Sequence, residues 1–187
     1  ISTKYSGLKD AITLMKPFLK EDTIIVSCLN GIPSETILRE QFPEHKVIRT
    51  IVQGMDSTYL NNEVTFTVLG ELLFGEEFVQ EKQACDLLEE FYQRVQIPYR
   101  RCEDIVFDQW NKLMFNCGIN QTCAAYYSTY GGCKVDGVLR DIFIQAMKEV
   151  KEVANAYGIS LSDENIENWK VVLSQLTDEG MPSMRQD

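Results

Sequence analysis

The stretch 23–42, TIIVSCLNGIPSETILREQF, decides the fold of this chain. Residues 23–29 form a β-branched run that is typical of a buried strand, and Asn30-Gly31 is a common turn dipeptide. A helix is predicted from Pro33 to about Phe42, because proline is tolerated in the first turn of a helix. The stretch therefore predicts a strand, a tight turn and a helix, which is the unit that builds α/β sheets.

Strand and helix patterns alternate on both sides of this stretch. They predict a strand at 1–4, a helix at 8–19, a strand at 47–52, further strands or a hairpin at 63–75, and a helix at 80–95. Because strands that alternate with helices usually lie parallel, we expect a parallel α/β sheet.

After Arg101 almost every pattern is helical, so we place a domain boundary there, with domains 1–101 and 102–187. The predicted helices are 104–126, 138–157 with Gly158 after its end, and 162–176 with Ser162 or Asp163 as N-cap. The chain starts on a predicted strand and ends at 182–187, where the pattern predicts the start of another helix. We expect a fragment; the alternative is a complete protein with frayed termini.

Charge and hydropathy exclude several classes of protein. The formal net charge of −10 disfavours binding to nucleic acid or to an anionic membrane, while a small anionic ligand needs only one or two local cations. No apolar run approaches the roughly 20 residues of a membrane span, and residues 1–10 do not resemble an export signal. We therefore expect a cytoplasmic protein.

Cysteine and histidine usage argues against a metal site. The six cysteines form no C-x-x-C pair, and His45 is the only histidine, so no zinc pattern is present. We expect free, buried thiols in a reducing cytoplasm, with a disulfide or a reactive thiol as the alternative. The single histidine lies in a polar segment and is a poor candidate for triad chemistry.

The segment 110–120, WNKLMFNCGIN, carries the candidate chemistry. Lys112, Asn116 and Asn120 are spaced by four, which puts them in a line along one flank of a largely apolar helix. One interpretation is structural: the lysine reaches water and the asparagines bind neighbouring backbone. The functional interpretation is a cleft in which the ammonium donates a proton and the amides orient an oxygenated substrate.

A second candidate is Asn30, because ligands of open α/β sheets bind beyond the carboxyl ends of strands. The alternative is an ordinary Asn-Gly turn without a ligand.

Two segments together resemble the ketopantoate reductase family. They are the strand that ends in Leu29-Asn30-Gly31 and the pattern W-x-K-L-x-x-N-x-x-x-N of residues 110–120. Supporting positions are Lys4, Gly70, Gly75, Glu149, Gly158 and the end 182–187, which is similar to the family's S-S-M-x-x-D.

The resemblance implies an incomplete Rossmann-like NADP-binding domain, a helical C-terminal domain like that of 6-phosphogluconate dehydrogenase, and an active site between them. It implies NADPH-dependent reduction of 2-dehydropantoate to (R)-pantoate in pantothenate and coenzyme A biosynthesis. Lys112 matches the general acid, and Asn116, Asn120 and Ser183 match substrate-binding positions. Lys4 and Asn30 match positions at the NADP(H) cofactor, Asn30 helping to align substrate and nicotinamide. A homodimer, if one forms, would be made through the helical domain.

The departures from the family pattern are also informative. The chain has no G-x-G-x-x-G motif, and a glutamate expected about twelve residues after Ser183 would lie beyond Asp187. Tyr130 stands where a further asparagine is expected, and Pro182 stands for the first serine of S-S-M. These differences leave open a reductase of another 2-oxo acid, or a non-catalytic protein of the same fold that binds NADP or oligomerises.

Overall fold

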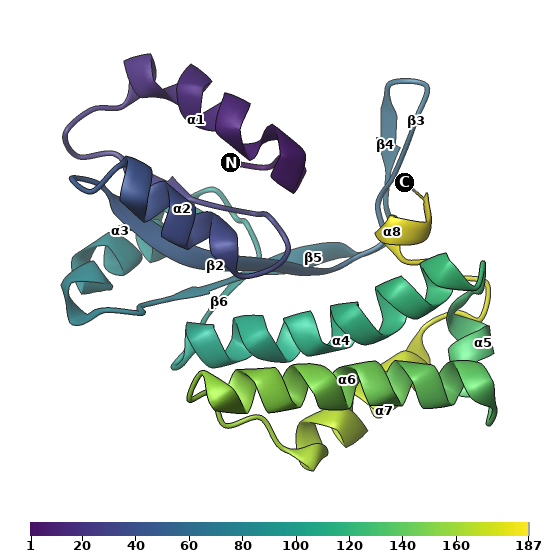
Figure 1. Ribbon diagram of the computed structural model, residues 1–187. Coiled ribbons are helices and arrows are strands. Elements are labelled where there is room, and N and C mark those ends of the chain that lie inside the picture. Colours follow the sequence, from purple (N-terminus) through teal and green to yellow (C-terminus); the bar gives the residue numbers. More distant parts are fainter. Residues whose placement is uncertain (187) are drawn as a thin grey trace. The chain divides into compact units, whose positions relative to one another are not determined.

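The computed structural model describes residues 1–186 and divides into two compact units, Ile1–Asp108 and Gln109–Asp187 (Figure 1). Asp187, the last residue of the predicted C-terminal motif, lies outside the described residues. The predicted domain boundary at Arg101 rests on a change of sequence pattern and stays a prediction. Each unit is described by itself below.

The first unit contains a four-stranded sheet in the order β1-β2-β5-β6 and a separate hairpin of β3 and β4. Its elements are α1 (Leu8–Met15), β1 (Ile24–Val26), α2 (Pro33–Gln41), β2 (Lys46–Met55), β3 (Thr58–Leu60), β4 (Glu63–Thr65), β5 (Leu69–Gly75), α3 (Lys82–Arg94) and β6 (Tyr99–Arg101). Short 3₁₀ turns cover Tyr5–Gly7, Lys16–Phe18 and Val79–Glu81.

The sheet is mixed, which corrects the expectation of a parallel sheet. β1 pairs with β2 and β5 with β6 in parallel, but β2 and β5 are antiparallel, with Ile51 opposite Leu73. A parallel pair needs a crossover connection, usually a helix, whereas β2 and β5 are joined only by the β3–β4 hairpin. Without that crossover the chain turns straight back along β2.

The predicted strand at 1–4 is also wrong as a strand. Ile1 bonds to the edge of the sheet: its nitrogen donates to Val26 O at 2.7 Å, and Cys28 N donates to Ile1 O at 2.8 Å. The 3₁₀ turn then begins at Tyr5. Ile1 nevertheless brings the following residues to the carboxyl end of β1.

Helices cover both faces of the sheet (Figure 1). Neighbouring residues of β2 point to opposite faces, so Val47 joins a core with α1 and α2 while Ile48 joins a core with α3. The first core contains Leu8, Ile12, Ile25, Leu29, Leu38, Phe42 and Val47, and the second contains Ile48, Phe74, Ala84, Cys85 and Tyr92. These two layers fix the strand that leads into the Asn30 turn.

The second unit is helical and begins within α4 (Ile105–Ala125), whose first turn belongs to the first unit. Its other helices are α5 (Tyr130–Lys134), α6 (Val138–Ala156), α7 (Asp163–Gln175) and α8 (Ser183–Gln186). The long predicted helices are confirmed within one or two residues at each end, and Gly158 has a φ of +83° just after α6. α5 was not predicted. The fold class, α/β followed by all-α, is confirmed.

No helix among residues 1–186 combines the length and apolar character that a membrane span needs.

Candidate functional site

Lys112, Asn116 and Asn120 occupy successive turns of α4, and each is half-buried. At about 100° per residue, a step of four residues shifts the side chain by only about 40° around the helix. The predicted line of one ammonium and two amides is therefore present on one side of this helix.

The opposite side of α4 packs against α6 and α7. Phe115 stacks on Trp169 with ring centroids 4.5 Å apart, and the Trp169 indole donates to the backbone oxygen of Asn111 at 2.9 Å. A Cβ at Gly118 would lie 2.8 Å from Phe143 Cδ2 and 2.9 Å from Met147 Cγ, so α4 and α6 approach closely here. The polar line of Lys112 thus lies on a different side of α4 from the residues that pack against α6 and α7.

Burial lowers the pKa of the Lys112 ammonium to about 8. Desolvation disfavours the charged form of an amine, so the proton is released more easily than from a lysine in water. A group whose pKa lies near neutral pH can both donate a proton and be reprotonated by the solvent. This property distinguishes Lys112 chemically from a lysine whose charge is solvated.

Ser183 is the first residue of α8 and is exposed. The segment before it is tied to the α5 region by two backbone bonds, from Tyr130 N to Gly180 O at 2.9 Å and from Gly131 N to Asp178 O at 3.0 Å. After it, Arg185 Nη1 donates to Ser128 O at 2.7 Å. These bonds fix the start of α8 within the second unit.

Tyr130, which replaces an expected asparagine, has a structural contact. A Cβ added at Gly180 would lie only 2.6 Å from Tyr130 Cδ2, so the ring packs directly on the backbone of Gly180. Burial raises the pKa of the Tyr130 hydroxyl. The ring therefore supports the segment that precedes Ser183.

Asn30 and Lys4 lie in the first unit and are both exposed. Asn30 sits in the turn after β1, where Gly31 takes a φ of +99° that favours glycine. Lys4 follows Ile1, which is bonded to the end of β1. Both residues thus follow backbone at the carboxyl end of the same strand, as ligand-binding residues of α/β sheets do.

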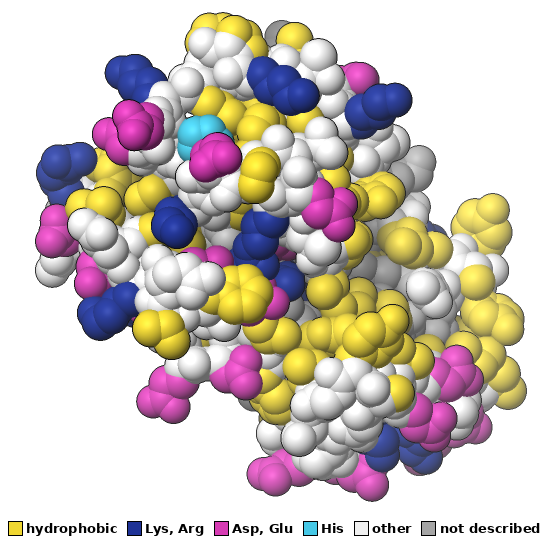
Figure 2. All heavy atoms as spheres, turned by 60° about the vertical axis from the view of Figure 1, so that its left-hand side comes forward, with side chains coloured by type: hydrophobic (Ala, Val, Ile, Leu, Met, Phe, Trp, Pro, Cys, Tyr) yellow, Lys and Arg dark blue, Asp and Glu magenta, His cyan; other side chains and the backbone are white. Residues whose placement is uncertain are grey.

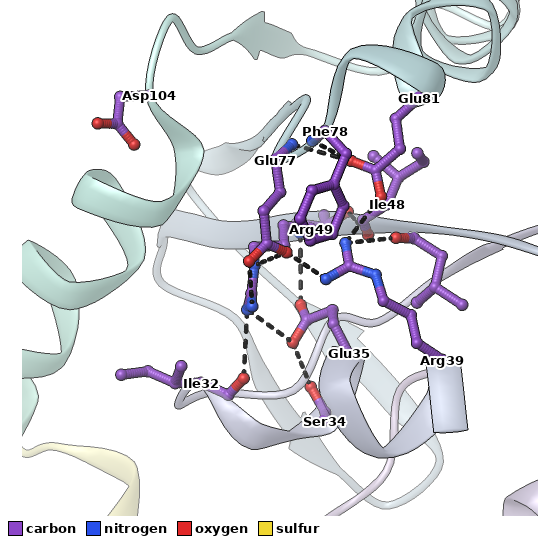
Figure 3. A network of polar contacts seen from close by, with 12 residues as sticks. Ile32, Ser34, Glu35, Arg39, Ile48, Arg49, Glu77, Phe78, Glu81 and Asp104 are labelled. Atoms are coloured by element: carbon purple, nitrogen blue, oxygen red, sulfur yellow. Dashed lines mark hydrogen bonds and ion pairs between the residues drawn. The ribbon is translucent and has the colours of Figure 1, made fainter. Parts of the chain in front are cut away.

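The structure also contains a charged network that the sequence did not predict (Figure 3). Arg49 Nε and Nη2 donate to the two oxygens of Glu77 at 2.7 and 3.1 Å. Arg39 also pairs with Glu77, and its Nη2 donates to Glu81 Oε1 at 2.9 Å. Burial by itself would raise the pKa of Glu77, but hydrogen bonds from Arg49 and Arg39 outweigh it and hold the pKa below its ordinary value.

Sequence reasoning could not find this network because its partners are far apart in the chain. A weak signal was available: Arg49 and Glu35 fall inside otherwise apolar patterns, where an unpaired charge would be costly. A charged residue in such a pattern predicts that an oppositely charged partner exists, but the sequence does not identify that partner.

The surface charges, the cysteines and the potential metal ligands bear on the predictions for nucleic-acid binding, disulfides and metal sites. On the face shown in Figure 2 acidic and basic side chains are mixed, without a broad basic area. All six cysteines are free, as predicted, but only four of them are buried, because Cys28 and Cys117 are half-buried. Among residues 1–186, no group of three or more His, Cys, Asp or Glu side chains is arranged to hold a metal ion.

Several solved structures share this fold, among them a 2-dehydropantoate 2-reductase and a D-mandelate dehydrogenase. The 2-dehydropantoate 2-reductase from Geobacter metallireducens has a TM-score of 0.89 at 23% identity, covering 100% of this chain and 62% of that one. D-mandelate dehydrogenase, in a ternary structure with NADH and anilino(oxo)acetate, has a TM-score of 0.88 at 19% identity, covering 99% and 60%.

Sequence comparison gives the family. A protein from Streptococcus pyogenes serotype M3 named 2-dehydropantoate 2-reductase is 22% identical over 187 residues, covering 99% of this chain and 60% of the relative's length. The family model described as ketopantoate reductase PanE/ApbA matches residues 1–77, and the model for the C-terminal part of the same family matches residues 104–187. The two matches follow one another along the chain, and the chain belongs to the ketopantoate reductase family.

Proposed function

We propose that this chain carries the proton-donating and substrate-binding part of an NADPH-dependent reductase that converts 2-dehydropantoate to (R)-pantoate. The observation that carries the proposal is the partly buried Lys112, with its pKa lowered to about 8, in line with two amides on α4.

Reduction of a 2-oxo acid places negative charge on the carbonyl oxygen as hydride reaches the carbon. Lys112 would stabilise that charge and donate the proton that makes the alcohol. Asn116 and Asn120, one and two turns further on, would orient the oxygen atoms of the substrate. Ser183, whose position at the start of α8 is fixed by Arg185 and Tyr130, would donate to the substrate carboxylate.

NADPH would supply the hydride when bound. Lys4 and Asn30 fit a dinucleotide in their chemistry, because an exposed cation and an exposed amide follow the carboxyl end of β1. Residues 1–187 contain no G-x-G-x-x-G motif, so we assign no residue of this chain to the pyrophosphate.

A related reductase of another 2-oxo acid is the second candidate. Two residues favour it. The Tyr130 ring packs on Gly180 in the segment that leads to Ser183, and Pro182, which directly precedes Ser183, is buried. A bulky ring in place of an asparagine removes one amide that could bind substrate oxygen. A homodimer through the second unit stays a prediction.

The test is NADPH oxidation by the complete gene product with 2-dehydropantoate, 2-oxoisovalerate and 2-oxoglutarate in parallel. The proposal predicts the highest kcat/KM with 2-dehydropantoate. A higher kcat/KM with one of the other acids would favour the second candidate. If none of the three acids supports NADPH oxidation while NADPH still binds, the proposed reduction of 2-dehydropantoate is contradicted.

A further inference from the structure

The turn that carries Asn30 is held at both ends by buried side chains. At its start, Leu29 N donates to Ser27 Oγ at 3.4 Å. At its end, Ile32 O accepts a hydrogen bond from Arg49 Nη1 at 3.3 Å (Figure 3). Ser27 directly follows β1 and Arg49 lies within β2, so residues from two neighbouring strands of the sheet hold the turn.

Glu35 connects the two holding points. Ser27 Oγ donates to Ser34 Oγ at 2.9 Å, and Ser34 Oγ donates to Glu35 Oε2 at 2.8 Å. The same carboxylate oxygen lies 3.9 Å from Arg49 Nη1. The Glu35 carboxylate therefore links the hydroxyl pair of Ser27 and Ser34 to the Arg49 guanidinium at the end of the turn. Figure 3 shows its contacts with Ser34 and Arg49.

The groups that hold the turn are buried. Ser27 and Glu35 have no exposed surface, and Arg49 is only 5% exposed. A buried carboxylate or guanidinium is tolerated only while its hydrogen bonds and charge partners stay in place. Since Glu77 binds Arg49 through both carboxylate oxygens, the guanidinium cannot move toward the turn or away from it without breaking that pair.

We propose that Glu35 and Arg49 are positioning residues that hold the Asn30 amide in the orientation needed for hydride transfer. The inference rests on the proposed function, because it assumes that Asn30 aligns the substrate and the nicotinamide. Neither Glu35 nor Arg49 needs to touch a ligand for this. They act through the backbone of residues 29–32, and a misplacement of about 1 Å at a reacting group can lower a rate by about 10²-fold.

The test is a double-mutant cycle of Glu35→Gln and Asn30→Ala in the complete gene product. We expect Glu35→Gln to lower kcat by about 10- to 100-fold while the substrate KM changes by less than about threefold, because alignment is lost and binding is kept. In the Asn30→Ala background the same substitution should change kcat by less than about twofold, because it acts only through Asn30.

Glu81→Gln is the matched control. Glu81 is 3% exposed and belongs to the same charged network, where it accepts hydrogen bonds from Arg39 and from the backbone of Glu77 and Phe78. The substitution removes the same charge from an equally buried site. It should lower the melting temperature as Glu35→Gln does but leave kcat within about twofold of the parent.

A second readout does not depend on activity. Hydrogen exchange of the Leu29 amide, which donates to Ser27, should become faster in Glu35→Gln and stay unchanged in Glu81→Gln. Should Glu35→Gln fail to fold, Ser34→Ala cuts the link between Ser27 and Glu35 without removing a charge, and the same cycle is run with it.

Three results would overturn the positioning role. They are an equal loss of kcat on Glu35→Gln with and without Asn30, an equal loss of kcat in Glu81→Gln, or unchanged exchange of Leu29. If Asn30→Ala alone leaves kcat unchanged, Asn30 does not align the substrate, and Glu35 and Arg49 have no positioning role in hydride transfer. The proposed reductase function is judged separately, by NADPH oxidation in the unsubstituted protein.

Discussion

The indole nitrogen of Trp169 donates to two oxygens of Asn111, the backbone oxygen at 2.9 Å and the side-chain Oδ1 at 2.8 Å. α7 is thereby fixed to the residue that directly precedes Lys112 in α4. The rotation of α4 about its own axis, and with it the direction of the Lys112 side chain, depends on this contact.

Trp169→Phe should destabilise the protein by about 1–3 kcal/mol. The ring contact with Phe115 is largely kept, but the Asn111 oxygens lose a half-buried donor. Urea unfolding measures the change, with Val171→Ala at an exposed site of the same helix as control, expected within about 0.5 kcal/mol of the parent. Equal midpoints for Trp169→Phe and the parent would show that the indole contact does not hold α7.

Gly118→Ala should cost about 1–3 kcal/mol of stability, because the added methyl group would overlap Phe143 and Met147. Gly7→Ala is the matched control, since its nearest neighbour, Thr3 Cβ, would lie at an ordinary 3.5 Å and its φ is −89°. Thermal unfolding compares the two variants. A Gly118→Ala protein as stable as the parent would mean that α4 and α6 can separate without cost.

Lys112→Met should stabilise the protein at pH 7, by an amount on the order of 1–2 kcal/mol. Below pH 8 the lysine is charged in both folded and unfolded protein, so folding includes the cost of burying an ammonium. One pKa unit corresponds to about 1.4 kcal/mol, and partial access to solvent reduces the total.

The advantage of Lys112→Met should then shrink as pH rises from about 8 to about 10.4. In this window the folded protein releases the proton and the unfolded chain keeps it, so the parent gains stability relative to the variant. Melting temperatures of both proteins across the window measure the difference. A difference that stays constant across this window would show that burial does not perturb the pKa of Lys112.

Asp56 should titrate below the ordinary aspartate value and control the base of the β3–β4 hairpin. Its carboxylate accepts from the Thr67 hydroxyl, and from Val68 N at 2.7 Å and Thr67 N at 2.8 Å, which lower its pKa. The hairpin contact is complete above about pH 3.9 and is lost as pH falls through the lowered pKa. NMR shifts of the Thr67 and Val68 amides should give a midpoint below about 3.9.

Asp56→Asn should abolish this titration while the amide signals remain. A midpoint at or above about 3.9 in the parent protein would show that the bonds to Asp56 do not favour its ionised form.

The sequence was sufficient to predict those helices, strands and turns that depend on residues close together in the chain. The β-branched run before Asn30, the proline at the start of α2 and the glycine after α6 each fix local backbone geometry, and the predicted elements follow. The line of Lys112, Asn116 and Asn120 was predictable for the same reason, since a helix turns by a constant angle per residue.

Features that depend on distant pairing were not predictable. The antiparallel direction of β5 follows from the β3–β4 hairpin, which turns through Asn61 and Asn62 with φ of +51° and +63°. An Asn-Asn pair suits such a turn, but the signal is weaker than Asn-Gly. The network of Arg49 and Glu77 depends on residues that only the folded sheet brings together.

The most direct test of the central claim is the turnover of Lys112→Ala in the complete gene product, with 2-dehydropantoate and saturating NADPH. We predict a fall in kcat of about 10²–10⁴-fold with little change in NADPH affinity, while the exposed Lys148→Ala stays at the parent rate. A Lys112→Ala protein that turns over as fast as the parent would contradict the account.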